Sequence, residues 1–306
     1  MASLSILELP FNLGLIEPMA GAQPGVNQLP GWLKKYGFHS KLQPAAVYTL
    51  VAPPYSMYID DESGVRNADA ISSYAKEQAT LLQKLVTQKS FVVALGGDCS
   101  ILIGNTLALK QMGSFALFFL DGHTDFAWPT MSASKGAAGM DLAIVTGHAH
   151  EKLSGIHGLS PYVKEENVWC VGNRDYDERY VAAINNSKIN YFNLDTLRGI
   201  GIESCCHSFL KMTEEKNLDG FWIHFDVDVL DDEIMPAVDS REKGGMNYEE
   251  LKNILRILLD SDKAVGIEIT ILDPTLDPTG IFTNKFVDEL AQVIKEKKGA
   301  SKTPSL

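Results

Sequence analysis

Two short motifs in this 306-residue chain place carboxylates and an imidazole at a spacing that suits metal binding. The first, DGHTD, sets Asp121, His123 and Asp125 two residues apart. The second, DVD, repeats that spacing with Asp226 and Asp228. Residues two apart share one face of an extended chain, so two such strands side by side would bring four carboxylates and an imidazole to one spot.

Carboxylates that lie close together repel one another, and they stay ionised only when cations neutralise them. Oxygen ligands with a few imidazoles are typical of sites for Mn²⁺ and similar divalent ions, with Ni²⁺ or Co²⁺ as alternatives. Two such ions about 3.5–4 Å apart share a water molecule and lower its pKa, which produces a hydroxide nucleophile for hydrolysis. A single D-x-D after a strand is often only a turn or a helix cap, so the prediction depends on both motifs together.

The elements that must position these motifs alternate regularly along the chain. Short, continuous apolar runs are typical of buried parallel strands, and the longer amphipathic segments between them predict helices. The predicted strands are Phe91–Leu95, Phe115–Leu120, Val168–Val171, 221–225 and 264–269, with a first strand near the N-terminus; the predicted helices lie near 66–88, 100–112, 176–186, 203–216, 247–260 and 283–297. This alternation predicts a three-layer α/β/α sandwich with a mostly parallel sheet, formed as one domain over residues 1–306 with a flexible polar tail near 298–306.

Both acidic motifs directly follow predicted strands, and a third motif, GGDCS, follows the strand Phe91–Leu95. Ligands of parallel sheets bind beyond the carboxyl ends of the strands. The position of the motifs therefore favours a functional site over a purely structural use of these residues.

The composition argues against several classes of function. A net charge of −12, with no basic run outside the C-terminal tail, disfavours binding to nucleic acid or to an anionic membrane. No apolar run is long enough to cross a membrane, and the N-terminus has no basic region ahead of its apolar stretch, so we expect no membrane span and no signal peptide. The four cysteines form no C-x-x-C pair, which indicates a reducing, cytoplasmic environment.

Taken in order, the motifs resemble those of the arginase–agmatinase–formimidoylglutamase superfamily, the ureohydrolases, from about residue 10 to residue 297. GGDCS resembles the family's G-G-D-H-S, DGHTDF resembles D-A-H-x-D, and HFDVDVLDD resembles S-x-D-x-D-x-x-D-P. GNRDYD, at residues 172–177, is similar to an arginase segment, and residues 235–251 follow the third motif as in the family. The resemblance implies an eight-stranded parallel sheet, hydrolysis of a guanidino or related C–N group by hydroxide bridging two Mn²⁺ ions, and a homo-oligomer, a trimer or a hexamer.

The resemblance also implies roles for single residues. Asp121 and Asp226 would bridge both ions, Asp125 would bind one ion and relay a proton, and His123 and Asp228 would bind the other ion.

Two further residues match family positions that contact the substrate. Asp177 matches an arginase aspartate beside the substrate's amino group, and Ser134 matches a serine of the loop that holds the substrate.

Two departures from the family pattern concern the metal site. Cys99 stands where the family has its first histidine ligand, and it is either a thiolate ligand or a small buried residue. His224 stands where the family usually has serine. It either compensates for the missing histidine, as a ligand or as a partner of a ligand, or it is a core histidine bonded to the backbone.

Other departures concern the substrate. Ala127 replaces an asparagine that holds the amino-acid carboxylate in arginases, and the proton-shuttle histidine falls near Ala138. In the last strand, GIEITILDP places Glu268 at the family's aspartate and Ile271 at the glutamate that grips the guanidinium. Glu268 remains a candidate catalytic residue. An unpaired guanidinium in such a pocket would cost several kcal/mol, which argues against L-arginine as the substrate.

Two functions of different classes follow. The first is a metal-dependent hydrolase of a guanidino or amidino compound; arginase proper, agmatinase, formimidoylglutamase and a hydrolase of N-hydroxylated guanidines are alternatives within this class. The second is a catalytically weak relative that binds a small molecule, a metal or a protein partner.

Overall fold

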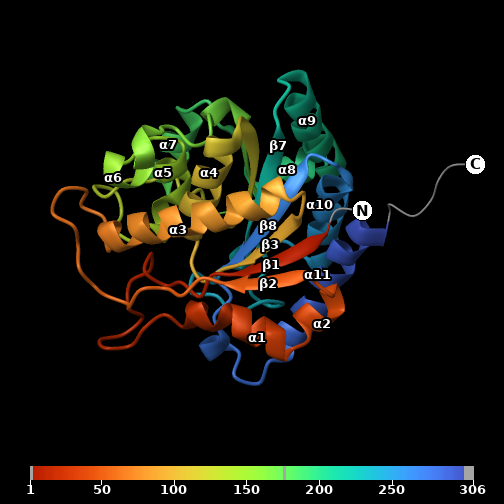
Figure 1. Cartoon of the computed structure of the whole chain (residues 1–306), viewed down its shortest axis with the longest axis horizontal. Coiled ribbons are helices and arrows are strands. Elements are labelled where there is room, and N and C mark those ends of the chain that lie inside the picture. Colours follow the sequence, from red (N-terminus) through yellow and green to blue (C-terminus); the bar gives the residue numbers. More distant parts are fainter. Residues whose placement is uncertain (1–2, 175–176, 300–306) are drawn as a thin grey trace, which may run out of the picture.

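A computed structural model of the chain describes residues 3–174 and 177–299, and its centre is an eight-stranded sheet in the order β2-β1-β3-β8-β7-β4-β5-β6 (Figure 1). All neighbouring strands of this sheet pair in parallel, which confirms the expected eight-stranded parallel sheet. The strands are β1 (Leu4–Glu8), β2 (Ala46–Thr49), β3 (Phe91–Leu95), β4 (Phe115–Leu120), β5 (Val168–Val171), β6 (Asn190–Phe192), β7 (Gly220–Asp226) and β8 (Ala264–Thr270).

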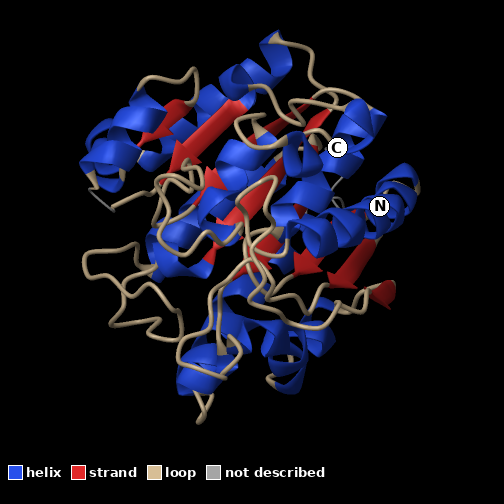
Figure 2. Ribbon diagram, turned by 90° about the vertical axis from the view of Figure 1, so that its left-hand side faces the viewer, coloured by secondary structure: helices blue, strands red, loops and turns tan. Residues whose placement is uncertain are grey.

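Helices cover both faces of the sheet, as Figures 1 and 2 show, so the three-layer sandwich is confirmed. One face carries α3 (Ala68–Thr87), α4 (Ile101–Met112), α5 (Asp141–Val145), α6 (Glu151–Ser154) and α7 (Glu178–Asn185). The other face carries α1 (Leu29–Lys35), α2 (Phe38–Leu42), α8 (Leu194–Ile200), α9 (Ile202–Glu215), α10 (Tyr248–Asp260) and α11 (Ile281–Gly299).

The continuous apolar runs of the central strands are explained by these two layers. Successive side chains of a strand point to opposite faces, so a strand that is covered on both sides needs apolar residues throughout. In β4, Phe118 and Leu120 join the core under α8–α11, whereas Leu117 and Phe119 join the core under α3–α7.

The predicted strands agree with the structure to within one residue, while the edge strands β2 and β6 were not predicted. The predicted helix near 283–297 extends over Ile281–Gly299, so it includes the first residues of the polar tail. Residues 300–306 of that tail lie outside the described residues, as do Asp175 and Tyr176 of the GNRDYD motif.

Helix α10 begins as the sequence predicts. The Asn247 side chain accepts a hydrogen bond from the Glu250 amide, and the Glu250 carboxylate accepts one from the Asn247 amide, each at 2.9 Å. This reciprocal capping satisfies two amides that the helix itself leaves unpaired.

None of the described helices combines the length and the apolar character that a membrane crossing requires.

Candidate metal centre

The two acidic motifs meet because β4 and β7 are neighbours in the sheet. Leu120, the last residue of β4, is paired with Phe225, so Asp121 and Asp226 follow at the same level beyond the paired region. The parallel ladder therefore delivers both motifs to the carboxyl edge of the sheet, where ligands of such sheets bind.

The side chains converge through turns, not through one extended face as the spacing suggested. Strand β4 ends before Asp121, and residues Val227–Val229 form a short 3-10 helix after β7. Asp125 has a φ of 43°, in the left-handed region that non-glycine residues seldom adopt. The residues of the i, i+2 pattern do lie together, although the conformation that gathers them is a pair of tight turns.

Short hydrogen bonds hold these turns. The His123 amide donates to Asp121 Oδ1 at 2.6 Å, and the Asp228 amide donates to Asp226 Oδ1 at 2.9 Å. His123 Nδ1 lies 2.9 Å from Asp228 Oδ2. In this way each motif uses one carboxylate oxygen for its own turn, while the second oxygen points away from that turn.

Cys99 joins the same cluster from the loop between β3 and α4. Its Sγ lies 2.7 Å from Asp226 Oδ2 and 3.2 Å from Thr270 Oγ1, and the side chain is buried. The preceding Gly97 allows this approach, because a Cβ at that position would lie 1.5 Å from the Phe11 carbonyl oxygen. The GGD segment thus brings the thiol against the acidic motifs.

His224 occupies the middle of a polar column in an otherwise apolar layer. Its ring stacks on Phe119 of β4 with centroids 4.3 Å apart, and its Nδ1 lies 2.5 Å from Glu268 Oε1 of β8. The column continues through hydrogen bonds from Asn105 of α4 to Glu268 and from Gln78 of α3 to Asn105. The strand register pairs His224 with both Phe119 and Glu268, so the sheet itself fixes the ring.

The other ring nitrogen of His224 points into the cluster. Nε2 lies 3.6 Å from Asp121 Oδ2, and both atoms are buried without a hydrogen-bond partner. A buried polar group without a hydrogen-bond partner lowers the stability of the fold. Each such atom in a native protein therefore needs an explanation, and a bound ion is one. An imidazole with one nitrogen on a carboxylate and the other unpartnered has the arrangement of a histidine metal ligand.

The electrostatics of the cluster also favour a bound cation. Burial and the neighbouring carboxylates raise the pKa of Asp125 and Asp226 well above the ordinary value. Burial acts against the charge on Asp121 as well, but the nearby imidazoles of His123 and His224 outweigh it and lower the Asp121 pKa. A divalent ion would remove the repulsion that raises the first two values.

Within residues 3–174 and 177–299, potential ligand atoms fall into three overlapping groups, and within each group all the atoms lie within 4.8 Å of one another. The groups are Asp121–His123–Asp228, Cys99–Asp121–His224–Asp226 and Cys99–Asp125–Asp141. All five residues of the two acidic motifs are included, together with Cys99 and His224. The donor set of carboxylates, imidazoles and one thiol fits first-row divalent ions.

Asp141 was not predicted from the sequence. It is fully buried at the start of α5, and neither of its carboxylate oxygens has a hydrogen-bond partner. The available signal was a single carboxylate inside the apolar run GAAGMDLAIV. Asn105 and Gln78 of the polar column were also missed, since nothing in their local sequence marks them.

A cavity of about 380 Å³ opens onto the cluster. Cys99, His123, Asp125, Asp226 and Asp228 form part of its wall. The rest of the wall is built mainly from small and apolar residues, and none of the described residues that line it is a lysine or an arginine.

Some of the predicted substrate residues line the cavity and others do not. Ser134 lines the cavity, and so do the departures Ala127, Ala138 and Ile271. Glu268 is fully buried beneath His224 and does not line the cavity, so the structure places it behind the ligands and not against a substrate.

Asp177 also lies outside the described lining of the cavity. It caps α7 and pairs with Arg179 at 2.7 Å, while Tyr180 of the same helix reaches the cavity wall.

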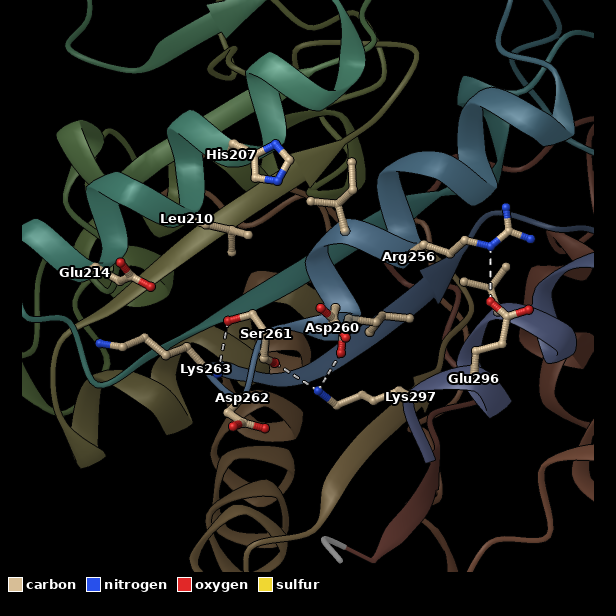
Figure 3. Close-up of a pocket in the computed structure, with 13 residues that line it drawn as sticks. His207, Leu210, Glu214, Arg256, Asp260, Ser261, Asp262, Lys263, Glu296 and Lys297 are labelled. Carbon is tan, nitrogen blue, oxygen red and sulfur yellow. Dashed lines mark hydrogen bonds and ion pairs between the residues drawn. The ribbon is translucent and has the colours of Figure 1, made fainter. Parts of the chain in front are cut away.

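A second, larger hollow of about 720 Å³ lies among α9, α10, α11 and the turn that leads into β8 (Figure 3). Lys297 bonds the Leu259 and Ser261 carbonyl oxygens there, and Arg256 pairs with Glu296. It adjoins the amino end of β8, and no group of metal-ligand atoms found among the described residues includes its lining. The candidate ligand groups therefore lie at the opposite edge of the sheet.

Comparisons with known proteins agree with this geometry. The sequence profile described as the Arginase family matches residues 10–294. An arginase of Brevibacillus brevis is 27% identical over 299 residues, which cover 96% of this chain and 98% of that protein. Among solved structures, arginase from Bacillus caldovelox superposes with a TM-score of 0.86 at 24% identity, covering 96% of this chain and 98% of that one. Formimidoylglutamase from Bacillus subtilis superposes with a TM-score of 0.72 at 19% identity, covering 100% of this chain and 89% of that one.

Proposed function

Because this chain belongs to the arginase family, we propose that it is a binuclear-metal hydrolase that cleaves a C–N bond in a guanidino or amidino compound. The observation that carries the proposal is the convergence of the three ligand groups on one cavity, with buried ligand atoms of Asp121, His224 and Asp141 left without partners.

One ion would be held by Asp121, His123 and Asp228, and the other by Asp121, Asp226, Cys99 and His224. The two groups share Asp121, as a bridging carboxylate requires. Mn²⁺ is the ion that the family resemblance favours, while the thiol and the added imidazole of the second group favour Co²⁺, Ni²⁺ or Zn²⁺.

His224 would take the place of the histidine that is missing at position 99. Its Nδ1 is engaged by Glu268, so Nε2 is the nitrogen that faces the ion. Glu268 then acts as a positioning residue that orients the ring and increases its basicity.

The bound ions would supply a nucleophile at neutral pH by lowering the pKa of a shared water molecule. Asp125 stands in the cavity wall, where its carboxylate would accept a proton and pass it to the departing amine. The net reaction adds water across one C–N bond and releases the amine with that proton.

The cavity wall supports a substrate without an α-carboxylate. The described lining offers no lysine or arginine to pair with a carboxylate, and Ala127 stands at the family's carboxylate-binding position. The lining also includes hydroxyl side chains, which suit a neutral polar group or an amine: Thr124, Ser132, Ser134, Tyr180 and Ser240. We also propose a reducing, cytoplasmic location, because all four cysteines are buried and unpaired.

The test is a substrate panel with the metal-loaded protein. Urea or ammonia release is measured for L-arginine, agmatine, other guanidino acids and amines, N-hydroxyguanidines and formimino acids after loading with Mn²⁺, Co²⁺, Ni²⁺ or Zn²⁺. We expect turnover of at least one guanidine that lacks an α-carboxylate, faster than that of L-arginine.

The controls are Asp121→Asn and Asp226→Asn, which should abolish both metal binding and turnover. Turnover retained in either variant would refute the assignment of the site. Two bound ions per chain without turnover of any compound in the panel would favour the catalytically weak relative.

A further inference from the structure

Asp141 is a buried carboxylate for which the metal ligands described so far have no use. It is fully shielded from solvent at the start of α5, and neither oxygen forms a hydrogen bond of good geometry. The Leu142 backbone amide lies close enough to favour the charged carboxylate, although its geometry is not that of a regular hydrogen bond. Ala138 and Gly139, just before it, line the cavity, so the carboxylate lies directly behind the cavity wall.

The groups that face Asp141 are all acidic. Its carboxylate lies within 4.8 Å of ligand atoms of Cys99 and Asp125. The carboxylates of Asp125, Asp121 and Glu268 are the charged groups that act on it. Like charges gathered in this way repel one another, and a cation among them would remove that repulsion.

A neutral, purely structural Asp141 explains the site less well. A protonated carboxyl group would still need an acceptor for its hydrogen, and a buried polar group without a partner destabilises the fold. Both oxygens of Asp141 lack partners, and so do Asp121 Oδ2 and His224 Nε2 in the adjoining group. A single cation would satisfy unpartnered atoms on several residues at once.

We infer that Asp141 is a metal ligand of this chain: with Cys99 and Asp125 it holds the ion that the family's missing histidine would have held. The inference deepens the proposed metal centre and rests on it. A thiolate combined with carboxylates and the imidazole of His224 selects a first-row ion of the Co²⁺ or Zn²⁺ class over Mg²⁺ or Ca²⁺.

The test compares the full-length chain with Asp141→Asn, which keeps the shape and removes the charge. Metal content is measured by elemental analysis after dialysis, and Co²⁺ titration is followed by the absorption of the thiolate–cobalt bond. We expect two ions per native chain, whereas the variant should bind one of them at least about 10-fold more weakly, with a diminished thiolate band. Asp239→Asn is the matched control, because Asp239 lines the cavity but belongs to none of the three ligand groups.

Thermal unfolding of the metal-free proteins gives a second readout. Asp141→Asn removes an unpaired buried carboxylate, so the metal-free variant should be at least as stable as the native chain, and added metal should stabilise it less. Asp141→Ser serves the same comparison if the asparagine variant does not fold.

The inference is overturned if Asp141→Asn binds both ions with native affinity and shows the native thiolate band. Absence of metal binding by the native chain would instead refute the proposed function, so the two failures are distinguishable.

Discussion

Ile271 stands at the end of β8, in the cavity wall, with a φ of 71°. A β-branched residue in the left-handed region is strained, at a cost of about 1–3 kcal/mol, and such strain gathers at functional sites. The Ile271 amide donates to the Gly97 carbonyl at 2.8 Å, which ties the turn to the loop that carries Cys99. An apolar side chain is therefore held at the position where the family resemblance expects a guanidinium-binding glutamate.

That position gives a prediction at the residue scale. Ile271→Glu should raise kcat/KM for L-arginine by about 10-fold or more, because a carboxylate that pairs with a guanidinium contributes about 1.5–3 kcal/mol. Steady-state kinetics of the metal-loaded variant measure it.

Ile271→Gln is the matched control, since it has the same length without the charge. An equal gain in both variants would mean that size and not charge limits arginine turnover.

At the scale of elements, the register of β4, β7 and β8 sets the metal centre. Phe119, His224 and Glu268 lie side by side across the three strands, so the ring is clamped between an aromatic face and a carboxylate. Helices α3 and α4 complete the clamp with Gln78 and Asn105.

This clamp predicts that Glu268→Gln weakens the binding of one ion by about 10–100-fold. The glutamine can still accept a hydrogen bond, but it no longer supplies the charge that increases the basicity of the imidazole. Co²⁺ titration measures the affinity.

Asn105→Ala is the graded control for that experiment. It leaves the Glu268–His224 contact in place and removes only the outer partner, so its effect should be smaller. An equal loss of metal affinity in Asn105→Ala and Glu268→Gln would show that the column acts through its packing and not through the Glu268 charge.

Helix α10 offers a prediction of stability that is independent of the metal. Asn247→Ala removes the cap and should lower the free energy of unfolding by about 1 kcal/mol, which is about 2 °C in Tm for a domain of this size. Asn247→Asp keeps the acceptor and should retain the native Tm in calorimetry; a comparable loss in both variants would exclude the cap as the cause.

Elements buried on both sides were predictable, while those at the edges were not. The central strands β3, β4 and β7 are continuous apolar runs, a signal that survives without knowledge of the fold. The edge strand β2 alternates between half-buried and exposed residues over only four positions, and β6 has three half-buried residues, so neither differs clearly from a loop.

The candidate site divides in the same way. Asp121, His123 and Asp226 were predictable because each follows a recognisable strand at a ligand-like spacing. The sequence did not predict that Asp141 lies in the cluster or that Glu268 lies behind His224. Their neighbours come from distant parts of the chain, and only the packed layers bring them together.

For the whole molecule, the buried acids predict how stability depends on pH. In the metal-free chain, burial raises the pKa of Asp98, Asp125, Asp141 and Asp226 above the unfolded values. Groups with a raised folded pKa stabilise the protein below their unfolded pKa, and this stability is lost as the pH rises through the folded pKa. His39 opposes the trend, because burial lowers its pKa, whereas the raised pKa values of His123 and His224 act in the same direction as those of the four acids.

We therefore expect the metal-free chain to be more stable near pH 6 than near pH 8 in urea unfolding with a chelator present. Metal ions compete with protons for the same carboxylates, so metal should stabilise the chain more at the higher pH. If the free energy of unfolding of the metal-free chain rises from pH 6 to pH 8, these buried acids do not have the raised pKa values described.

The placement of His224 also bears on the order in which this centre evolved. If the ancestral histidine at position 99 had been lost first, the ion would have been left without an imidazole on that side. A histidine gained first at position 224, opposite a glutamate at 268, would have made the older ligand redundant and allowed cysteine to replace it. Lineages that retain an intermediate should therefore carry histidine at both positions, whereas lineages with histidine at neither should be rare among those that still bind two ions.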